Sequence, residues 1–464
     1  MKYVSTRGEA PELGFEDVMI TGLARDGGLY VPKDWPVFSE KDISQMAGCS
    51  YEEVAFQVMR PFTGATFTDS EFKEIINTSY RSFSSDKRCP VVKLRDNIFV
   101  LELYHGPTLA FKDVAMQLIG QMFEFSLKRR KKNVVIVGAT SGDTGSAAIE
   151  AFKGLDSVEV FIMYPDGAVS EVQRRQMTTA IENNVNALAI EGNFDDCQAR
   201  LKDMFNDFDF RDEVNLASVN SINWARVMAQ VVYYFTAALA VGAPKNKVNF
   251  AVPTGNFGDI FAGYVAKKMG LPIERLIIAT NQNDILDRVV KSGIYKIEQV
   301  KPSISPSMDI QVSSNFERAL FDIFANDSSR IKTLMDELKI SEKFILTSEE
   351  TKMLQAVFES GSSSEVETND VISSIFKENG NLICPHTATG LKVAMEKNEV
   401  SDTPMIVLAT ASPVKFPDAV KIASGVSPEL PAHMSDLLER DEHITNVPND
   451  IDRIKKLIIE SIKS

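Results

Sequence analysis

The sequence NVVIVGATSGDTGSAAIEAFKG, residues 133–154, joins an apolar run to a glycine-containing turn and then to a helical pattern. The same succession occurs in KVNFAVPTGNFGDIFAGYVAKKMG, residues 247–270. An uninterrupted apolar run is typical of a strand buried on both faces, and a helix that follows it at once indicates a βαβ unit. These two stretches therefore decide the fold class, which is α/β with mostly parallel sheets flanked by helices.

Four more apolar runs, at residues 158–165, 186–192, 275–280 and 404–411, predict further buried strands. Together the runs form two groups, more than one sheet usually holds, so we expect two lobes. Before them, the pairs Ser50 with Glu53 and Thr68 with Glu71 have the capping-box spacing of helix starts. We therefore expect a mainly helical domain at residues 1–95, a smaller α/β lobe at 96–235 and a larger one at 236–464.

Three segments carry local expectations. Residues 227–243 form a 17-residue run without charge, short of the roughly 20 residues that a membrane span needs, and predict a helix buried inside the protein. Residues 359–370, ESGSSSEVETND, predict a polar loop. Residues 452–464 have amphipathic periodicity and predict a terminal helix that docks on the rest of the chain.

The charge of the chain limits its partners. Of 464 residues, 50 are Lys or Arg and 64 are Asp or Glu, which gives a net charge of −14. So acidic a surface repels nucleic acid and anionic membranes, and we expect neither as a partner. The first residues lack the apolar stretch of a signal peptide, and the cysteines (Cys49, Cys89, Cys197, Cys384) and histidines (His105, His386, His433, His443) lack metal-site spacing. We expect a reduced, cytoplasmic protein without a metal.

Lys112 is the first candidate for chemistry. It lies in YHGPTLAFKDVAMQ, residues 104–117, between apolar neighbours and at the start of a helical pattern. A lysine in an apolar pocket can lose its proton near neutral pH and attack an aldehyde. The local sequence also fits a surface lysine at a helix start, so both interpretations stay open on these residues alone.

Two turns are candidates for binding anions. TSGDTG, residues 140–145, and PTGNFG, residues 253–258, each connect an expected strand to an expected helix. The first amides of a helix have no partner within the helix, so they can donate to a carboxylate or a phosphate. Each turn could instead cap its own helix. TSGDTG matches neither the phosphate loop of nucleotide-binding proteins nor the dinucleotide fingerprint.

Thr410 and Ser412 lie where the strand at 404–411 ends. Ligands of open α/β sheets bind beyond the carboxyl ends of the strands, so both hydroxyls are well placed to contact one. Hydroxyl side chains at strand ends are also common without any function.

Taken together and in order, these motifs resemble the threonine synthase family, pyridoxal-phosphate enzymes of the tryptophan synthase β-like fold type. The resemblance extends from the first residues to about Phe416. Its segments include MKYVSTRG, GLARDGGLYVP, HGPTLAFKDVAMQ, ATSGDTGSAA, NSINWARVMAQ, VPTGNFGDIFAGY and MDIQVSSNFER. One departure is Ser412, where the family pattern leads us to expect a histidine.

The resemblance implies a role for each candidate residue. Lys112 would be the catalytic residue and would carry pyridoxal 5'-phosphate covalently. Thr410 would face the pyridine nitrogen, and the cofactor phosphate would lie on Gly255, Asn256, Phe257, Gly258 and Asp259. The substrate carboxylate would lie on Ser141, Gly142, Asp143 and Thr144, and its phosphate on Asn315 and Arg318.

The implied reaction converts O-phospho-L-homoserine and water to L-threonine and phosphate, the last step of threonine biosynthesis. One alternative is a related lyase or dehydratase that releases a 2-keto acid. Another is a binding or regulatory protein that kept the fold but holds no cofactor. The sequence leaves open whether the chain is a monomer or a homodimer.

Overall fold

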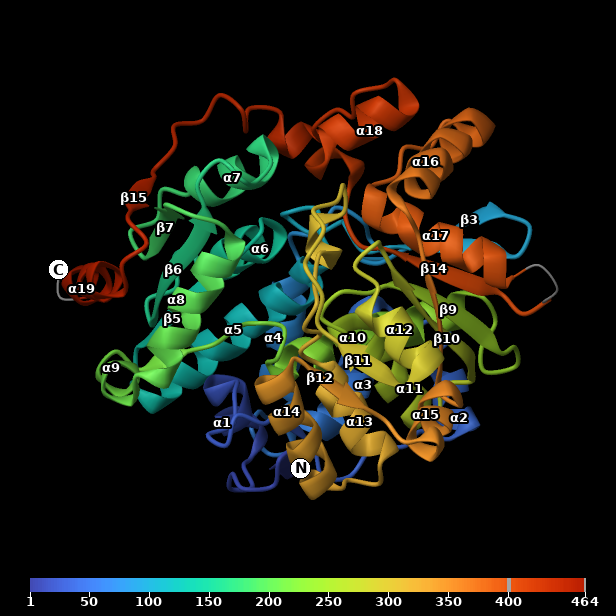
Figure 1. Cartoon of the computed structure of the whole chain (residues 1–464), viewed down its shortest axis with the longest axis horizontal. Coiled ribbons are helices and arrows are strands. Elements are labelled where there is room, and N and C mark those ends of the chain that lie inside the picture. The colour runs from blue at the N-terminus through green and yellow to red at the C-terminus, as the bar shows by residue number, and fades with distance from the viewer. Residues whose placement is uncertain (399–401, 463–464) are drawn as a thin grey trace.

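Two sheets organise the protein, which is seen here in a computed structural model that describes residues 1–398 and 402–462 (Figure 1). The smaller sheet has the order β15-β7-β6-β5-β8, and all its strands are parallel. Its strands are β5 (Val134–Ala139), β6 (Val158–Pro165), β7 (Val185–Ile190), β8 (Leu216–Ala217) and β15 (Thr445–Val447).

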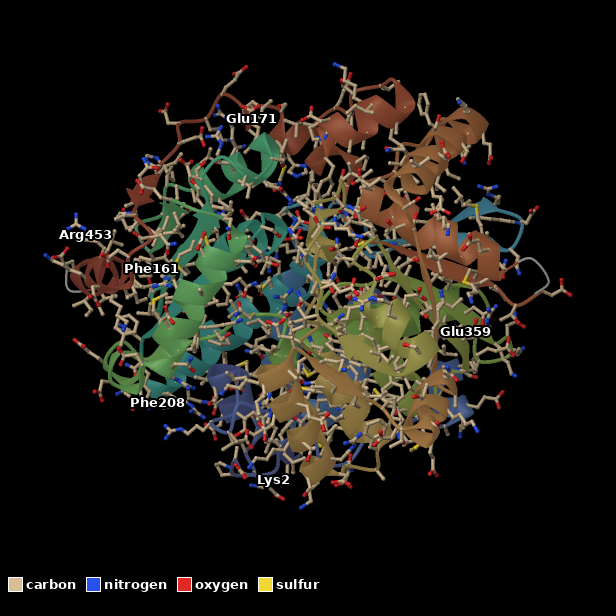
Figure 2. The ribbon with its side chains drawn as sticks, in the orientation of Figure 1. Lys2, Phe161, Glu171, Phe208, Glu359 and Arg453 are labelled. Atoms are coloured by element: carbon tan, nitrogen blue, oxygen red, sulfur yellow. The ribbon has the colours of Figure 1, made fainter. Side chains whose placement is uncertain are left out.

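The larger sheet has the order β13-β10-β9-β14-β4-β3 and is parallel except for the edge strand β3. Its strands are β3 (Val91–Arg95), β4 (Ile98–Glu102), β9 (Val248–Pro253), β10 (Ile273–Thr280), β13 (Phe358–Ser362) and β14 (Met405–Ala409). Figure 2 shows the two lobes side by side, with Phe161 of β6 in one and Glu359 of β13 in the other.

The six expected strands and the α/β class are confirmed. The chain crosses between the lobes more often than the expected boundaries allow. β4 pairs with β14 and belongs to the larger sheet, although we placed residues 96–235 in the smaller lobe. Conversely, β15 pairs with β7 of the smaller sheet, although we placed it with the larger lobe. Strand pairing between segments so far apart in sequence leaves no local signal, so the expected boundaries missed both crossings.

The helices cover both faces of the sheets. α8 (Phe194–Asn206), α9 (Phe208–Glu213) and α19 (Ile451–Ser461) pack on one face of the smaller sheet, where Ile454 and Ile458 of α19 are buried. The expected docking of the C-terminal helix is thus confirmed. The other helices of the smaller lobe are α5 (Lys112–Arg130), α6 (Asp143–Phe152) and α7 (Glu171–Thr178).

The larger lobe contains further helices and a short two-stranded sheet. α16 (Glu365–Asn379) and α17 (Pro385–Lys397) pack on one face of its main sheet. The remaining elements are α10 (Trp224–Ala240), α11 (Gly258–Lys268), α12 (Ile285–Ser292), β11 (Ile294–Lys296), α13 (Phe316–Ile323), α14 (Ser328–Ser341), β12 (Lys343–Ile345), α15 (Ser348–Gln355) and α18 (Pro417–Ser424). No helix in the described ranges has both the length and the apolar character that a membrane crossing requires.

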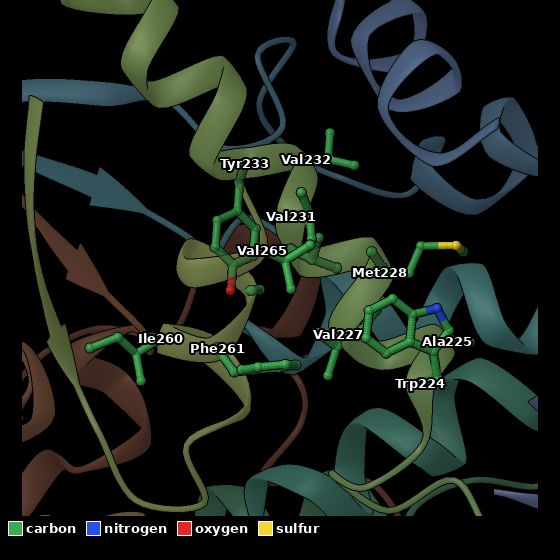
Figure 3. Packing of buried hydrophobic residues seen from close by; sticks show 14 of the residues in the cluster. Trp224, Ala225, Val227, Met228, Val231, Val232, Tyr233, Ile260, Phe261 and Val265 are labelled. Atoms are coloured by element: carbon green, nitrogen blue, oxygen red, sulfur yellow. The ribbon is translucent and has the colours of Figure 1, made fainter. Parts of the chain in front are cut away.

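α10 is the central helix of the protein. Trp224, Val227 and Met228 on this helix are fully buried, and Figure 3 shows it beside Ile260, Phe261 and Val265 of α11. A helix that is buried on all sides is apolar all around, whereas a surface helix is apolar on one side only. The expected interior helix at the charge-free run 227–243 is therefore confirmed.

The N-terminal domain packs onto this same core. It pairs β1 (Tyr3–Ser5) with β2 (Tyr30–Pro32) and contains α1 (Phe15–Thr21), α2 (Glu40–Gln45), α3 (Tyr51–Thr63) and α4 (Asp69–Tyr80). Ser50 and Thr68 cap α3 and α4 through capping boxes, as their spacing predicts.

The expected polar loop at 359–370 is wrong. Residues Phe358–Ser362 form β13, and α16 begins at Glu365. Ser364 caps α16 and forms a capping box with Glu367, so the serine-rich stretch is a helix start. A Cβ on Gly361 would lie 2.8 Å from a methyl group of Val393, which shows that α17 crosses this strand closely.

Gly120 tests the packing of α5 against α6. A Cβ at this position would lie 2.3 Å from the carbonyl oxygen of Ala151, so the two helices touch where only glycine fits. We expect Gly120→Val to lower the free energy of unfolding by about 1–3 kcal/mol, because backbone must move to admit the side chain. Chemical denaturation measures this, with Gln121→Ala on the same helix as the control. Equal stabilities for the two variants would contradict this packing.

Candidate active site

Lys112 is the first residue of α5, and the backbone just before it is held by the end of β14. The amide of Phe111 donates to the carbonyl oxygen of Thr410 at 2.8 Å, and Ala110 pairs with Ala411. The amide of Ser412 donates to the carbonyl oxygen of Leu109 at 2.9 Å. This short antiparallel pairing places Lys112 and Thr410, both buried, at the carboxyl edge of the larger sheet.

The surroundings of the Lys112 amine favour its neutral form. The side chain is 11% exposed, and Nζ lies 4.9 Å from the centre of the Phe111 ring and 3.7 Å from Asp143 Oδ2. Burial lowers the pKa of Lys112, and the charges of Arg226 and Lys415 lower it further, while Asp143 opposes them. A lysine of this kind can act as a nucleophile or a base near neutral pH.

Lys415 is a second, fully buried lysine at the same carboxylate. Its Nζ lies 3.0 Å from Asp143 Oδ1 and donates to Thr108 O and Gln176 Oε1, both at 2.8 Å. Burial by itself would raise the pKa of Asp143, but the two lysine charges hold it well below its usual range. Asp143 therefore stays ionised and bridges the two lysines. Its side chain contacts Lys112, a contact that the expectation for residues 141–144 did not include.

The turn between β5 and α6 leaves amides free to bind an anion. The Thr140 hydroxyl accepts hydrogen bonds from the amides of Gly142 and Gly145, both at 2.9 Å, and so fixes the turn. Gly142 has a φ of +133°, which a residue with a side chain rarely adopts. The amides of Ser141, Asp143 and Thr144 donate no hydrogen bond within the described chain. The geometry suits a carboxylate at this turn.

The turn between β9 and α11 has the same property. Phe257 adopts the left-handed conformation with a φ of 64°, and no side chain caps the helix. The amides from Gly255 to Gly258 donate to no acceptor in the described part of the chain. Their carbonyls, in contrast, are held: Ser313 Oγ donates to Gly255 O at 2.6 Å, and Asn315 Nδ2 donates to Asn256 O at 3.0 Å. The turn is fixed from behind while its donors stay available for an anion such as a phosphate.

Asp259 follows this turn and is buried. Tyr233 Oη and Tyr234 Oη donate to its Oδ1, the latter at 3.0 Å, and its Oδ2 has no partner among the described residues. Burial raises the pKa of Asp259 to about 7, although the tyrosines and the Lys112 charge lower it in part. A carboxyl group that keeps its proton repels a phosphate on the neighbouring amides far less than an ionised one.

His386 connects the lysine side of the site to this turn. Its Nε2 accepts a hydrogen bond from the Ser307 amide at 3.3 Å, and its ring packs on Phe416 at 4.7 Å. Ser307 O in turn lies 2.8 Å from where a Cβ on Gly255 would be. Burial lowers the pKa of His386 to about 4, with Asp143 opposing and Lys112 adding to the shift. The ring is therefore neutral near pH 7.

Asn315 and Arg318 lie behind the turn. Arg318 is fully buried and donates to Tyr30 O at 3.1 Å, to Ile222 O and to Asn315 Oδ1. Its three nitrogens are thus each engaged with the protein, and burial lowers its pKa to about 9. Arg318 thereby holds the Asn315 side chain, whose Nδ2 donates to the carbonyl oxygen of Asn256. These contacts do not support the expected contact of Arg318 with a substrate phosphate.

Three residues of this site were missed in the sequence. Lys415 has the signal that singled out Lys112, a lysine between apolar residues just beyond a strand. His386 was considered only as a metal ligand, and Arg226 was quoted within a motif without a role. No cluster of three or more metal-ligating side chains occurs within residues 1–398 and 402–462.

Family models and curated relatives match almost the whole chain. The model of the threonine synthase N terminus matches residues 2–80, that of the pyridoxal-phosphate dependent enzymes matches 87–411, and that of the threonine synthase C-terminal region matches 387–458. The threonine synthase of Pseudomonas aeruginosa is 50% identical over 99% of this chain and 98% of its own. The threonine synthase of Saccharomyces cerevisiae is 42% identical over 92% of this chain and 90% of its own.

Solved structures show the same likeness. The crystal structure of pyridoxal-phosphate-bound threonine synthase from Brucella melitensis has a TM-score of 0.97 and 54% identity, and the likeness covers 100% of both chains. Yeast threonine synthase has a TM-score of 0.94 and 39% identity over 100% of this chain and 99% of its own.

The raised pKa of Asp259 predicts that the free energy of unfolding depends on pH. Its carboxyl group has a pKa of about 7 in the folded protein against 3.8 for the free side chain, so between these values the folded chain holds a proton that the unfolded chain releases. Stability should therefore fall as pH rises from about 4 to 7. Asp259→Asn mimics the neutral acid and should flatten this part of the curve. Denaturation at several pH values measures it, with exposed Asp86→Asn as the control; an unchanged slope would refute the raised pKa.

Proposed function

The chain belongs to the threonine synthase family of pyridoxal-phosphate-dependent enzymes, and we propose that it converts O-phospho-L-homoserine and water to L-threonine and phosphate. The observation that carries this proposal is one buried lysine amine of lowered pKa at the edge of a sheet, together with two turns whose amides are free. The proposed reaction is that of the family, and the lysine amine and the free amides are groups that this reaction requires.

The residues present fit pyridoxal phosphate. The turn at Gly255–Gly258 offers unpaired amides for the phosphate, and a side chain on Gly255 would collide with Ser307 O. Thr410, 6% exposed, offers a hydroxyl just beyond the end of β14. We propose that Lys112 holds the cofactor covalently, Thr410 contacts its ring nitrogen, and Gly255, Asn256, Phe257, Gly258 and Asp259 form the phosphate site.

When bound, pyridoxal phosphate supplies an aldehyde for amines and a ring that accepts an electron pair. The chain supplies the proton transfers. Lys112 Nζ would take the proton from the α-carbon of the substrate, a transfer that its lowered pKa favours. It would then take a proton from the β-carbon and, after phosphate has left the γ-carbon, return a proton to the γ-carbon. Water would add at the β-carbon. Asp143, fixed by Lys415, keeps the amine in place between these steps.

The substrate carboxylate has its own site in this proposal. The free amides of Ser141, Asp143 and Thr144, with Gly142 between them, face an anion at the start of α6. Because the carboxylate of Asp143 is paired with Lys415, it repels a second carboxylate there less than an unpaired carboxylate would. For Asn315 and Arg318 we propose a positioning role at the cofactor turn instead of a contact with the substrate phosphate.

A rival within the fold type would release a 2-keto acid by elimination without the addition of water.

We also propose that the enzyme is cytoplasmic and needs neither nucleic acid nor a membrane, in keeping with its charge of −14. Sedimentation decides between a monomer and a homodimer.

Lys112→Ala should abolish covalent attachment of the cofactor and lower turnover by about two to four orders of magnitude, because the base is lost. Mass spectrometry after reduction shows the attachment site, and an assay of both L-threonine and 2-oxobutyrate from O-phospho-L-homoserine shows the product. Lys128→Ala, an exposed lysine on the same helix, is the control. A cofactor still attached in the Lys112 variant would exclude this lysine, and 2-oxobutyrate as the main product of the native enzyme would favour the rival.

Gly255→Ala should weaken retention of the cofactor, because its Cβ would lie 2.8 Å from the backbone oxygen of Ser307 and displace the turn. We expect roughly a tenfold loss of affinity, which a shift of about 1.4 kcal/mol would produce. Absorbance after dialysis measures it. Gly138→Ala is the matched control, since its Cβ would meet only the end of the Ile162 side chain at 3.0 Å. Equal occupancy in the two variants would refute the phosphate turn.

A further inference from the structure

The turn at Gly255–Gly258 is oriented through two of its carbonyl oxygens. Ser313 Oγ donates to the first, Gly255 O, at 2.6 Å. Asn315 donates twice to the second, Asn256 O, from its backbone amide at 3.1 Å and from Nδ2 at 3.0 Å. A trans peptide is planar, so its carbonyl oxygen and its N–H point in opposite directions. Fixing these two carbonyls therefore also fixes the directions of the next two amides along the turn, which have no acceptor in the described chain.

The N-terminal domain holds the side chain of Asn315. Its Oδ1 accepts a hydrogen bond from Arg318 Nη1, and Arg318 Nε donates to Tyr30 O of β2 at 3.1 Å. The turn is thus connected to β2 through two side chains, although neither of them belongs to the N-terminal domain itself.

Glu317, in the first turn of α13, makes a second and charged connection to the same domain. Arg7 Nε donates to Glu317 Oε1 at 3.1 Å, and Arg7 Nη2 donates to Glu317 Oε2 at 3.0 Å. Thr6 Oγ1 also donates to Oε1, at 2.6 Å. Thr6 is in turn held beside β2, because it exchanges two hydrogen bonds of 2.9 Å with Leu29. The bidentate ion pair therefore ties the start of α13 to the ends of β1 and β2.

This ion pair is largely removed from water. The side chains of Arg7 and Glu317 are 26% and 7% exposed. Removal of one partner of such a pair leaves the other charge uncompensated, so the segments that they join should move apart. The residue that holds Asn256 O lies only two positions before Glu317, so a shift of Glu317 changes the direction of the free amides.

We infer that Arg7 and Glu317 are positioning residues for the cofactor phosphate. Within the described chain neither side chain bonds to the turn itself; they hold the start of α13, and Asn315 then holds the turn. The inference rests on the proposed function, in which the phosphate of pyridoxal phosphate lies on the turn at Gly255–Gly258. It makes the first residues of the chain part of what determines the affinity for the cofactor.

The test compares Glu317→Gln with Glu350→Gln. Glu350 has the same bidentate pattern, since Arg330 donates from Nε to Oε1 at 2.7 Å and from Nη2 to Oε2 at 2.9 Å, but this pair joins α14 to α15. Each substitution removes one carboxylate from one ion pair. Equilibrium dialysis of the holoenzyme against a range of pyridoxal phosphate concentrations measures the affinity.

We expect Glu317→Gln to bind pyridoxal phosphate about tenfold more weakly than the native enzyme, a loss typical of removing a group that orients the residues of a ligand site without touching the ligand. Glu350→Gln should bind it as the native enzyme does. Equal affinities in the two variants would overturn the inference.

Pyridoxal separates an effect on the phosphate donors from damage to the whole site. It has the aldehyde and the ring but no phosphate, so its binding to the full chain freed of cofactor does not use the turn. We expect the native enzyme and Glu317→Gln to bind pyridoxal equally. A loss as large as that for pyridoxal phosphate would mean that the substitution disturbs the site in general, and would overturn the inference.

If Glu317→Gln does not fold, Arg7→Lys tests the same pair from its more exposed partner. Lysine keeps the charge but cannot form both parallel hydrogen bonds. We expect binding of pyridoxal phosphate to weaken by about threefold, half of the tenfold effect in free energy, with binding of pyridoxal unchanged. An unchanged affinity for pyridoxal phosphate would overturn the inference.

These outcomes differ from a failure of the proposed function. Equal cofactor occupancy in Gly255→Ala and Gly138→Ala would refute the phosphate turn itself. Loss of cofactor from Gly255→Ala with native affinity in Glu317→Gln would refute only the role of the ion pair. None of these measurements requires turnover of O-phospho-L-homoserine.

Discussion

The site depends on one buried carboxylate shared by two lysines. Asp143 lies 3.0 Å from Lys415 Nζ and 3.7 Å from Lys112 Nζ, and all three residues are buried. Lys415 donates hydrogen bonds to Thr108 O and Gln176 Oε1, which hold its amine in place beside Asp143. Lys112 keeps the weaker contact, so its amine can leave Asp143 and return without exposing a bare charge. A single carboxylate with a single lysine would hold that amine more firmly and keep it protonated.

The topology brings these groups together. Lys112 precedes the smaller sheet in the chain, yet its backbone is registered by β14 of the larger sheet, through Phe111 and Thr410. The two turns with free amides then follow strands of different sheets, β5 and β9. A reaction centre that lies between two lobes can open to exchange substrate and close to exclude water, and each lobe contributes a separate group of donors.

Much of this arrangement is local and could be predicted. Apolar runs predicted six strands, two of them followed at once by glycine turns, and the capping pairs at Ser50 and Thr68 predicted helix starts. The likeness of the motifs to a family pointed to Lys112 and to both turns. What could not be predicted depends on distant pairing: β4 with β14, β15 with β7, and Lys415 with Asp143. Arg318 shows the same limit, since its sequence context suggests a ligand site while its partners, Tyr30 and Ile222, come from far along the chain.

The pairing of β15 with β7 has a consequence for biosynthesis. Residues 445–447 complete the edge of a sheet whose other strands were made more than two hundred residues earlier. While the ribosome is still translating the larger lobe, β7 exposes a row of unsatisfied backbone groups that can join another nascent chain. Expression of a chain that stops after α18 would leave that edge open permanently, so aggregation rather than loss of catalysis is the first defect that such a truncation would show.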